Sequence, residues 1–157
     1  MRASAPGWLH KGLHLEDRNV LLPWGADESK IGLLGEPTKS GSGEERLLCW
    51  LNARVLRGLT ASVGAKIDSH RGLRELELHL GGNEESPTET MTGISSHLRS
   101  LFGPPTRVHK SDQDQTATET WLMTPITISH GVFERFGHYY QMRIQHRGPI
   151  DHEMSAA

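Results

Sequence analysis

A chain of 157 residues suits one domain with a single core, and its 17 Gly and 8 Pro favour short elements joined by many turns. The formal net charge of −2 leaves no basic field to hold a phosphate backbone, so we expect no nucleic acid partner. The single cysteine, Cys49, excludes an intrachain disulfide, and no apolar run approaches the roughly 18 residues that a membrane span needs. We therefore expect a soluble cytoplasmic protein with no membrane partner.

The first predicted element is a hairpin over residues 12–23. In the segment LHLEDRNVLLPW, Leu13 and Leu15 alternate with polar residues, a polar turn follows at 16–19, and an apolar strand resumes at Val20.

A short helix follows in the segment ADESKIGLLG. Asp27 suits the N-cap, Ile31 and Leu34 share one face, and Gly35 suits the end of the helix. The interior Gly32 costs up to about 1 kcal/mol relative to alanine, so we expect this helix to be short and weak.

A polar loop, KSGSGEE, then leads into the pair Trp50-Leu51, a middle strand within residues 55–63 and a closing strand from residue 73. In the closing strand Leu76 and Leu78 point inward, while Glu75 and Glu77 point outward with His79.

The second helix is predicted more strongly. Ser86 and Glu89 have capping-box spacing, Pro87 sits at the first helical position, and Gly103 followed by prolines marks the end. The loop HKSDQDQTATE, the pair Trp121-Leu122, a middle strand over 126–136 and a closing strand over 139–148 follow in turn. In that closing strand Met142 and Ile144 point inward, and Gln141, Arg143 and Gln145 point outward.

The order of these features predicts two tandem repeats, over about 24–82 and 86–148. Gly35, Pro37 and Thr38 recur 68 positions later, the Trp-Leu pairs are 71 apart, and the closing strands align at an offset of 66. Chance is the alternative, because Gly-x-Pro is a short motif. We expect one domain over 1–157 of the α+β class, in which each repeat is a helix plus three strands and the helices cover one face of an antiparallel sheet.

No catalytic residue, metal site or cofactor is predicted. His10 and His14 have the spacing of ligands on a helix, but Gly12 between them and the strand-like context favour a solvated pair. Cys49 lies in the apolar stretch LLCWL, where burial makes a thiol inert, and no nucleophile motif occurs. We therefore expect that the protein is not an enzyme.

The predicted function is binding to another protein. Acidic residues gather in and after the first closing strand, and the stretch GVFERFGHYY has the aromatic and arginine composition of interface hot spots. The candidate partner-binding residues are Glu75, Glu77, Glu84, Glu85, Phe133, Arg135 and Tyr139.

The motifs LPWG at 22–25 and Gly-x-Pro at 35–37 and 103–105 resemble those of bacterial immunity proteins from polymorphic and type VI secretion toxin systems. The repeat order is similar to that of β-lactamase inhibitor proteins, in which one sheet face clasps an enzyme. The resemblance implies a cytoplasmic protein that neutralises a cognate toxin in a 1:1 complex. The alternative is a small enzyme or ligand-binding domain that uses histidines in a sheet cleft.

Overall fold

A computed structural model describes residues 4–40, 47–80, 86–111, 116–134 and 138–149. Three helices and ten strands are present in these ranges. They are α1 (Gly7–His10), β1 (Gly12–Leu15), β2 (Val20–Pro23), α2 (Glu28–Ile31), β3 (Thr38–Ser40), β4 (Leu47–Val55), β5 (Leu59–Asp68), β6 (Gly72–His79), α3 (Pro87–Phe102), β7 (Arg107–Ser111), β8 (Thr116–Leu122), β9 (Ile126–Glu134) and β10 (His138–His146).

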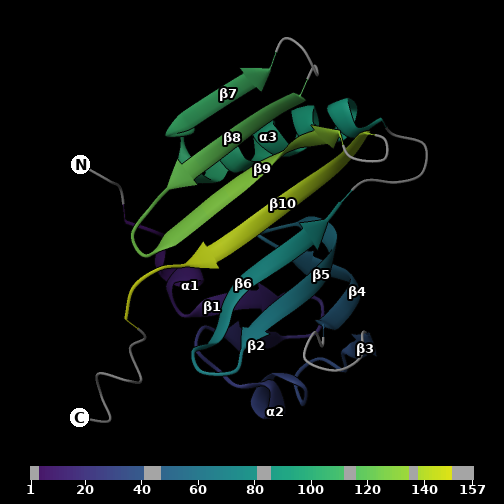
Figure 1. Ribbon diagram of the computed structural model, residues 1–157, viewed down its shortest axis with the longest axis vertical. Helices are drawn as coiled ribbons and strands as arrows, with labels where there is room; N and C mark the ends of the chain where they lie inside the picture. Colours follow the sequence, from purple (N-terminus) through teal and green to yellow (C-terminus); the bar gives the residue numbers. More distant parts are fainter. Residues whose placement is uncertain (1–3, 41–46, 81–85, 112–115, 135–137, 150–157) are drawn as a thin grey trace.

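Eight of the strands form one antiparallel sheet with the order β3-β4-β5-β6-β10-β9-β8-β7. The strands of each half stay together, and the closing strands β6 and β10 pair at the centre. Figure 1 shows α3 behind β8 and β9, with α1 and the β1–β2 hairpin behind the central strands. The predicted α+β class, with an antiparallel sheet and helices on one face, is confirmed.

The prediction of three strands per repeat is wrong, because each half contributes four. The additional strands are β3 and β7, which lie at the two edges of the sheet. Most of the predicted loop 109–119 belongs to β7 and β8. An edge strand has no neighbour on one side and is commonly charged, so the composition of β7, with Arg107, His109 and Lys110, looks like that of a loop.

The two predicted helices begin at their predicted caps. Asp27 Oδ1 accepts the Lys30 N–H at 2.9 Å, and Ser86 Oγ accepts the Glu89 N–H at 3.1 Å. α2 is short as expected, with four residues, but the predicted end at Gly35 is wrong: the helix ends at Ile31 and Gly32 is its C-cap, because glycine is a poor residue for continuing a helix. α3 has 16 residues and ends before Gly103, as predicted. α1 was not predicted; it is a single turn after Pro6.

Each half ties the end of its helical segment to its second strand with a tryptophan. The Trp50 indole N–H donates to the Leu34 carbonyl at 2.8 Å, and the Trp121 indole N–H donates to the Gly103 carbonyl at 2.9 Å. Both tryptophans are buried. The Gly103 carbonyl belongs to the C-cap of α3 and has no partner within the helix, whereas Leu34 lies in the turn that follows α2.

One hydrophobic cluster underlies the sheet from β4 to β6 and from β8 to β10. It includes Trp50 and Leu76 from the first half and Trp121 and Ile144 from the second. The β1–β2 hairpin, at the predicted residues 12–23, adds the buried Leu13 to this cluster. The two halves therefore share a core. No helix of the described ranges is long and apolar enough to cross a membrane.

Candidate functional site

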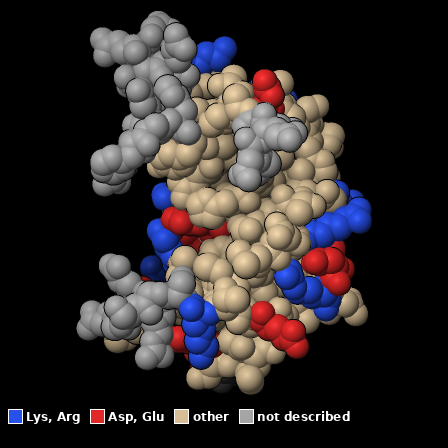
Figure 2. Space-filling model, turned by 90° about the vertical axis from the view of Figure 1, so that its right-hand side faces the viewer, with Lys and Arg blue, Asp and Glu red and all other residues tan. Residues whose placement is uncertain are grey.

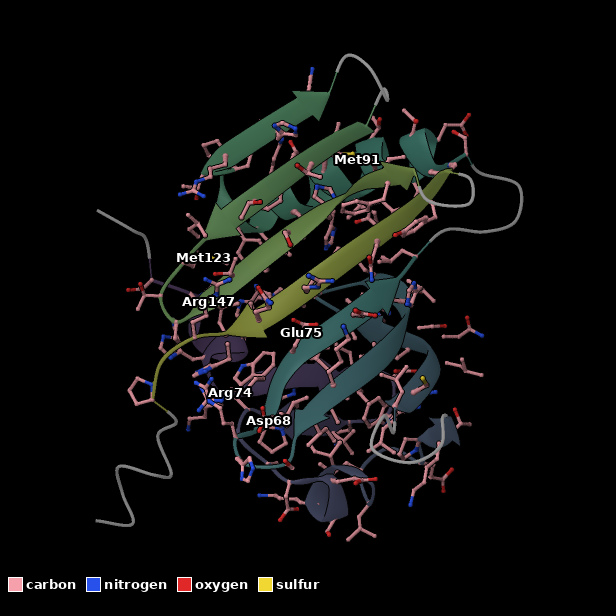
Figure 3. The ribbon with its side chains drawn as sticks, in the orientation of Figure 1. Asp68, Arg74, Glu75, Met91, Met123 and Arg147 are labelled. Atoms are coloured by element: carbon pink, nitrogen blue, oxygen red, sulfur yellow. The ribbon has the colours of Figure 1, made fainter. Side chains whose placement is uncertain are left out.

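The face of the sheet that points away from α3, called here the outer face, carries the predicted partner-binding residues that the structure describes. The strand register places Glu77 opposite Arg143 and Glu75 opposite Gln145 across the β6–β10 junction. Figure 3 shows Glu75 at the middle of the face that is turned to the viewer. Within the described residues, every helix and the hairpin lie on the other side or below the sheet (Figure 1).

An ion network joins the central strands on this outer face. Lys66 Nζ lies 2.6 Å from a Glu77 carboxylate oxygen and 3.1 Å from one of Glu75. Arg143 approaches the same carboxylates at 3.7 and 3.6 Å, and Gln145 Nε2 donates to Glu75 at 2.7 Å. Two acidic and two basic side chains thus meet across β5, β6 and β10.

The network controls protonation at the outer face. Burial acts to raise the pKa of Glu75, but hydrogen bonds from Gln145 and Lys66 and the charge of Arg143 outweigh it, so that the pKa lies below its usual value. The hydrogen bond to Glu77 raises the pKa of Lys66. Both groups are therefore charged at neutral pH.

The acidic character predicted for this region is locally balanced. Lys66 and Arg143 stand beside Glu75 and Glu77, and the side of the molecule in Figure 2 shows acidic and basic residues in mixed groups. Glu84 and Glu85, the other members of the predicted acidic set, lie outside the described residues.

The predicted aromatic pair is present on the same face. Tyr139 lies opposite Phe133 in the β9–β10 register, and their ring centroids are 5.8 Å apart. The two residues are 38% and 37% exposed, which is high for large apolar side chains. Arg135, the third predicted member, lies outside the described residues.

A buried polar network under α3 was not predicted. Glu119, His130 and Tyr140 come from β8, β9 and β10, and all three are buried. His130 Nε2 lies 2.7 Å from Glu119 Oε1, and His130 Nδ1 lies 2.8 Å from the Tyr140 hydroxyl. Arg99 of α3 donates to the second Glu119 oxygen.

The protonation states of this network follow from its geometry. Burial lowers the pKa of His130, although the neighbouring Glu119 opposes the shift, and burial raises the pKa of Tyr140 well above its usual value. Burial acts to raise the pKa of Glu119 too, but hydrogen bonds from Ser95, His130 and Arg99 outweigh it. A neutral His130 then donates from Nε2 to the Glu119 carboxylate and accepts the Tyr140 O–H at Nδ1.

The order carboxylate, imidazole, hydroxyl has the form of a proton relay, but its side chains are closed off from solvent. His130 is 1% exposed and Tyr140 is 6% exposed. We therefore assign a structural role to this network: through the hydrogen bond from Arg99 to Glu119 it holds α3 against the sheet. The sequence contains one indication of this network: Glu119 lies two residues before Trp121, so in a strand both side chains point to the same, inner face. This could be used only if β8 were known to be a strand.

A pocket of about 840 Å³ lies where the N-terminal segment meets the end of β10. Leu21, Pro23, Trp24 and Pro125 form apolar parts of its lining, and Lys11, Lys30 and Asp27 add charged groups. Two histidines, His10 and His146, also line it. No group of three or more His, Cys, Asp or Glu side chains in the described ranges is arranged to hold a metal ion.

The chain matches no family model and no curated protein. Among solved structures it is similar to a DUF4309 family protein (YjgB) from Bacillus subtilis subsp. subtilis str. 168. The TM-score is 0.49 and the sequence identity is 14%, over 78% of this chain and 79% of that chain.

Proposed function

We propose that the protein acts by stoichiometric binding of another protein through the outer face of its sheet. The most concrete form of this function is an immunity protein that covers the active site of a cognate bacterial toxin in a 1:1 complex. The observation that carries the proposal is that the exposed Phe133–Tyr139 pair and the Lys66–Glu77–Arg143 network share one sheet face that no described helix or hairpin covers.

The aromatic pair supplies the apolar anchor that such a contact needs. Interface hot spots are enriched in tyrosine and arginine, and they lie near the centre of the contact. The rings of Phe133 and Tyr139 contact each other from neighbouring strands, so less side-chain freedom is lost when a partner covers them.

The ion network supplies preorganised polar contacts. Glu75 and Glu77 are held by Lys66 and Arg143 before any partner arrives, so their side chains are already ordered. Because the face carries both signs of charge, we expect a partner surface with paired acidic and basic groups.

The test is coexpression of the protein with the product of the neighbouring gene in its source genome. We expect a 1:1 complex by size-exclusion chromatography with light scattering, and a Tyr139→Ala variant with at least about tenfold weaker affinity. Leu33→Ala is the matched control, because Leu33 is 86% exposed and lies after α2, away from the outer face.

Two results would contradict the proposal. One is a folded protein that binds no neighbouring product and instead turns over a small substrate. The other is a complex that Leu33→Ala weakens as much as Tyr139→Ala does, since the contact would then not lie on the outer face.

A further inference from the structure

The pocket at the end of β10 combines an apolar body with a cationic rim. Pro23, Trp24 and Pro125 line the body, while Lys11 follows α1 and Lys30 belongs to α2. Its volume of about 840 Å³ falls in the range typical of small-molecule sites. A lining of this kind suits a molecule with one apolar part and one charged group.

A further positive charge stands behind the pocket wall. Arg74 Nη1 donates to His146 Nδ1 at 3.1 Å and to the Gly148 carbonyl at 2.6 Å. Arg74 Nε is buried without a hydrogen-bond acceptor, and no carboxylate of the described residues forms an ion pair with this guanidinium. Figure 3 shows Arg74 between the beginning of β6 and the end of β10.

Arg74 also determines the tautomer of His146, which lines the pocket. A guanidinium can only donate, so His146 Nδ1 accepts and the ring proton of the neutral imidazole is on Nε2. His146 itself lines the pocket, so Arg74 holds a ring that forms part of the wall.

The charges at the pocket do not cancel. Lys11 and Lys30 line the pocket, and Asp27 is the one carboxylate among the described residues that do so; Arg74 adds a positive charge behind the wall, in contact with His146. Asp27 is already engaged as the N-cap of α2, where it accepts the Lys30 N–H. The surplus positive charge favours an anionic ligand, most strongly where apolar walls exclude water.

We propose that this pocket binds a small organic carboxylate with an aromatic or branched apolar body. The apolar body packs against Trp24 and the neighbouring prolines, and the carboxylate lies toward Lys11 and Lys30. The site shares no residue with the outer-face candidates, so it stands or fails independently of the proposed protein–protein function.

Three probes test separately the contribution of the carboxylate and that of the apolar body: phenylacetate, phenylacetamide and acetate. Isothermal titration should give phenylacetate a dissociation constant about tenfold lower than that of the uncharged amide, because the carboxylate adds a charge-assisted contact. Acetate lacks the apolar body and should bind more weakly than phenylacetate by a similar factor. Backbone NMR shifts should change at Gly25, Lys30 and His146.

Substitutions locate the site. Lys11→Gln and Lys30→Gln should each weaken phenylacetate binding by about threefold or more and leave phenylacetamide binding unchanged. Lys110→Gln on the edge strand β7 is the matched control and should change neither. Leu21→Trp, which places a larger side chain in the wall, should reduce binding of both aromatic probes.

Three outcomes would overturn the proposal. The first is equal affinity for phenylacetate and phenylacetamide. The second is no binding of phenylacetate at about 10 mM. The third is a set of NMR shift changes that map away from the pocket, together with unchanged binding in the Leu21→Trp variant.

Discussion

His130 and Glu119 occupy positions that are apolar in the first half of the chain. The β8–β9 register pairs Glu119 with His130, and the β4–β5 register pairs Leu48 with Ala65. Glu119 lies two residues before Trp121, as Leu48 lies two residues before Trp50. The second half therefore has a buried charged network at the place where the first half has hydrophobic contacts, and each polar atom in it needs its partner.

This network predicts a loss of stability in mild acid. The pKa of His130 is lowered from its usual 6.5 in the folded protein, so below about pH 6.5 the unfolded chain takes up a proton that the folded chain does not. The free energy of unfolding falls as the pH drops from there toward the folded pKa, by at most about 1.4 kcal/mol per pH unit. Urea unfolding at about pH 7.5 and about pH 5.5 measures the loss.

His130→Gln should remove this part of the pH dependence, because glutamine does not titrate. His70→Gln is the control, since His70 lies exposed in the β5–β6 turn. Glu119, whose pKa is also lowered, adds a further loss only below its usual value of 4.5. Parallel pH profiles for the native protein and His130→Gln would show that His130 is not held neutral by the fold.

The residues of the candidate sites could be predicted only in part. Alternation along the closing strand predicts that Glu75 and Glu77 point to the solvent-facing side of the sheet. The register agrees with this prediction, because it sets them opposite the polar residues Gln145 and Arg143 of β10. Their partners Lys66 and Arg143 come from β5 and β10, which become neighbours of β6 only through the topology. The pocket joins residues near 10–30 to Pro125 and His146, a proximity that no local pattern records.

At the scale of elements, the glycines of the two Gly-x-Pro motifs, Gly35 and Gly103, differ in what surrounds them. Gly103 has φ 79° and ψ −164°, a conformation that is essentially restricted to glycine, and a Cβ built there meets nothing within 4 Å. Gly35 has φ 65°, and its Cβ would lie 3.1 Å from Leu15 Cδ1 and 3.1 Å from Trp50 Nε1.

We predict that Gly103→Ala and Gly35→Ala each lower the free energy of unfolding by about 1 kcal/mol or more. The cause is backbone strain alone at Gly103, and strain together with displacement of the Trp50 indole at Gly35. Gly93→Ala within α3 is the control and should be neutral or stabilise by up to about 1 kcal/mol, because nothing lies within 4 Å of its Cβ. Denaturant unfolding gives all three values, and equal effects at Gly93 and Gly103 would argue against the conformational explanation.

Elements with strong end signals were predictable, and elements defined by their neighbours were not. The cap at Ser86 and the glycine at Gly103 bound α3 at both ends. The edge strand β7 has one partner, so its residues Val108, His109 and Lys110 stay exposed and show no buried alternation. Its identity as a strand depends on pairing with β8, which a local pattern does not contain.

For the whole molecule, the shared core and the central β6–β10 pair predict a single cooperative unit. Ile144 is fully buried in β10 and lies opposite Leu76 of β6. Ile144→Ala should cost about 2–5 kcal/mol of stability, and it should lower hydrogen-exchange protection equally in β5 and in β9. Leu33→Ala, at an exposed site, should leave protection unchanged. Loss of protection in β9 alone would mean that the halves unfold separately.

The fold class followed from the sequence because a capped helix followed by alternating strands occurs in the same order twice. The pairing of the two closing strands, β6 and β10, could not be predicted from the sequence. A repeat indicates which elements each half forms, but not which strands of the two halves become neighbours. Buried residues on both strands, such as Leu78 and Met142, are opposite each other at the junction and hold it in register.

The register of that junction has a consequence for which chains can pair. Leu76↔Ile144 and Leu78↔Met142 flank the Glu77↔Arg143 pair symmetrically, so a local two-fold axis passes between Glu77 and Arg143. If β6 of one molecule took the place of β10 beside β6 of another, the same axis would set Glu77 against Glu77, and two copies of β10 would set Arg143 against Arg143. Like charges directly opposite destabilise a strand pair, whereas the opposite charges of Glu77 and Arg143 stabilise it. The central pair thus disfavours pairing of either closing strand with its own copy in a second molecule, because each strand is matched in charge to the other closing strand and not to itself.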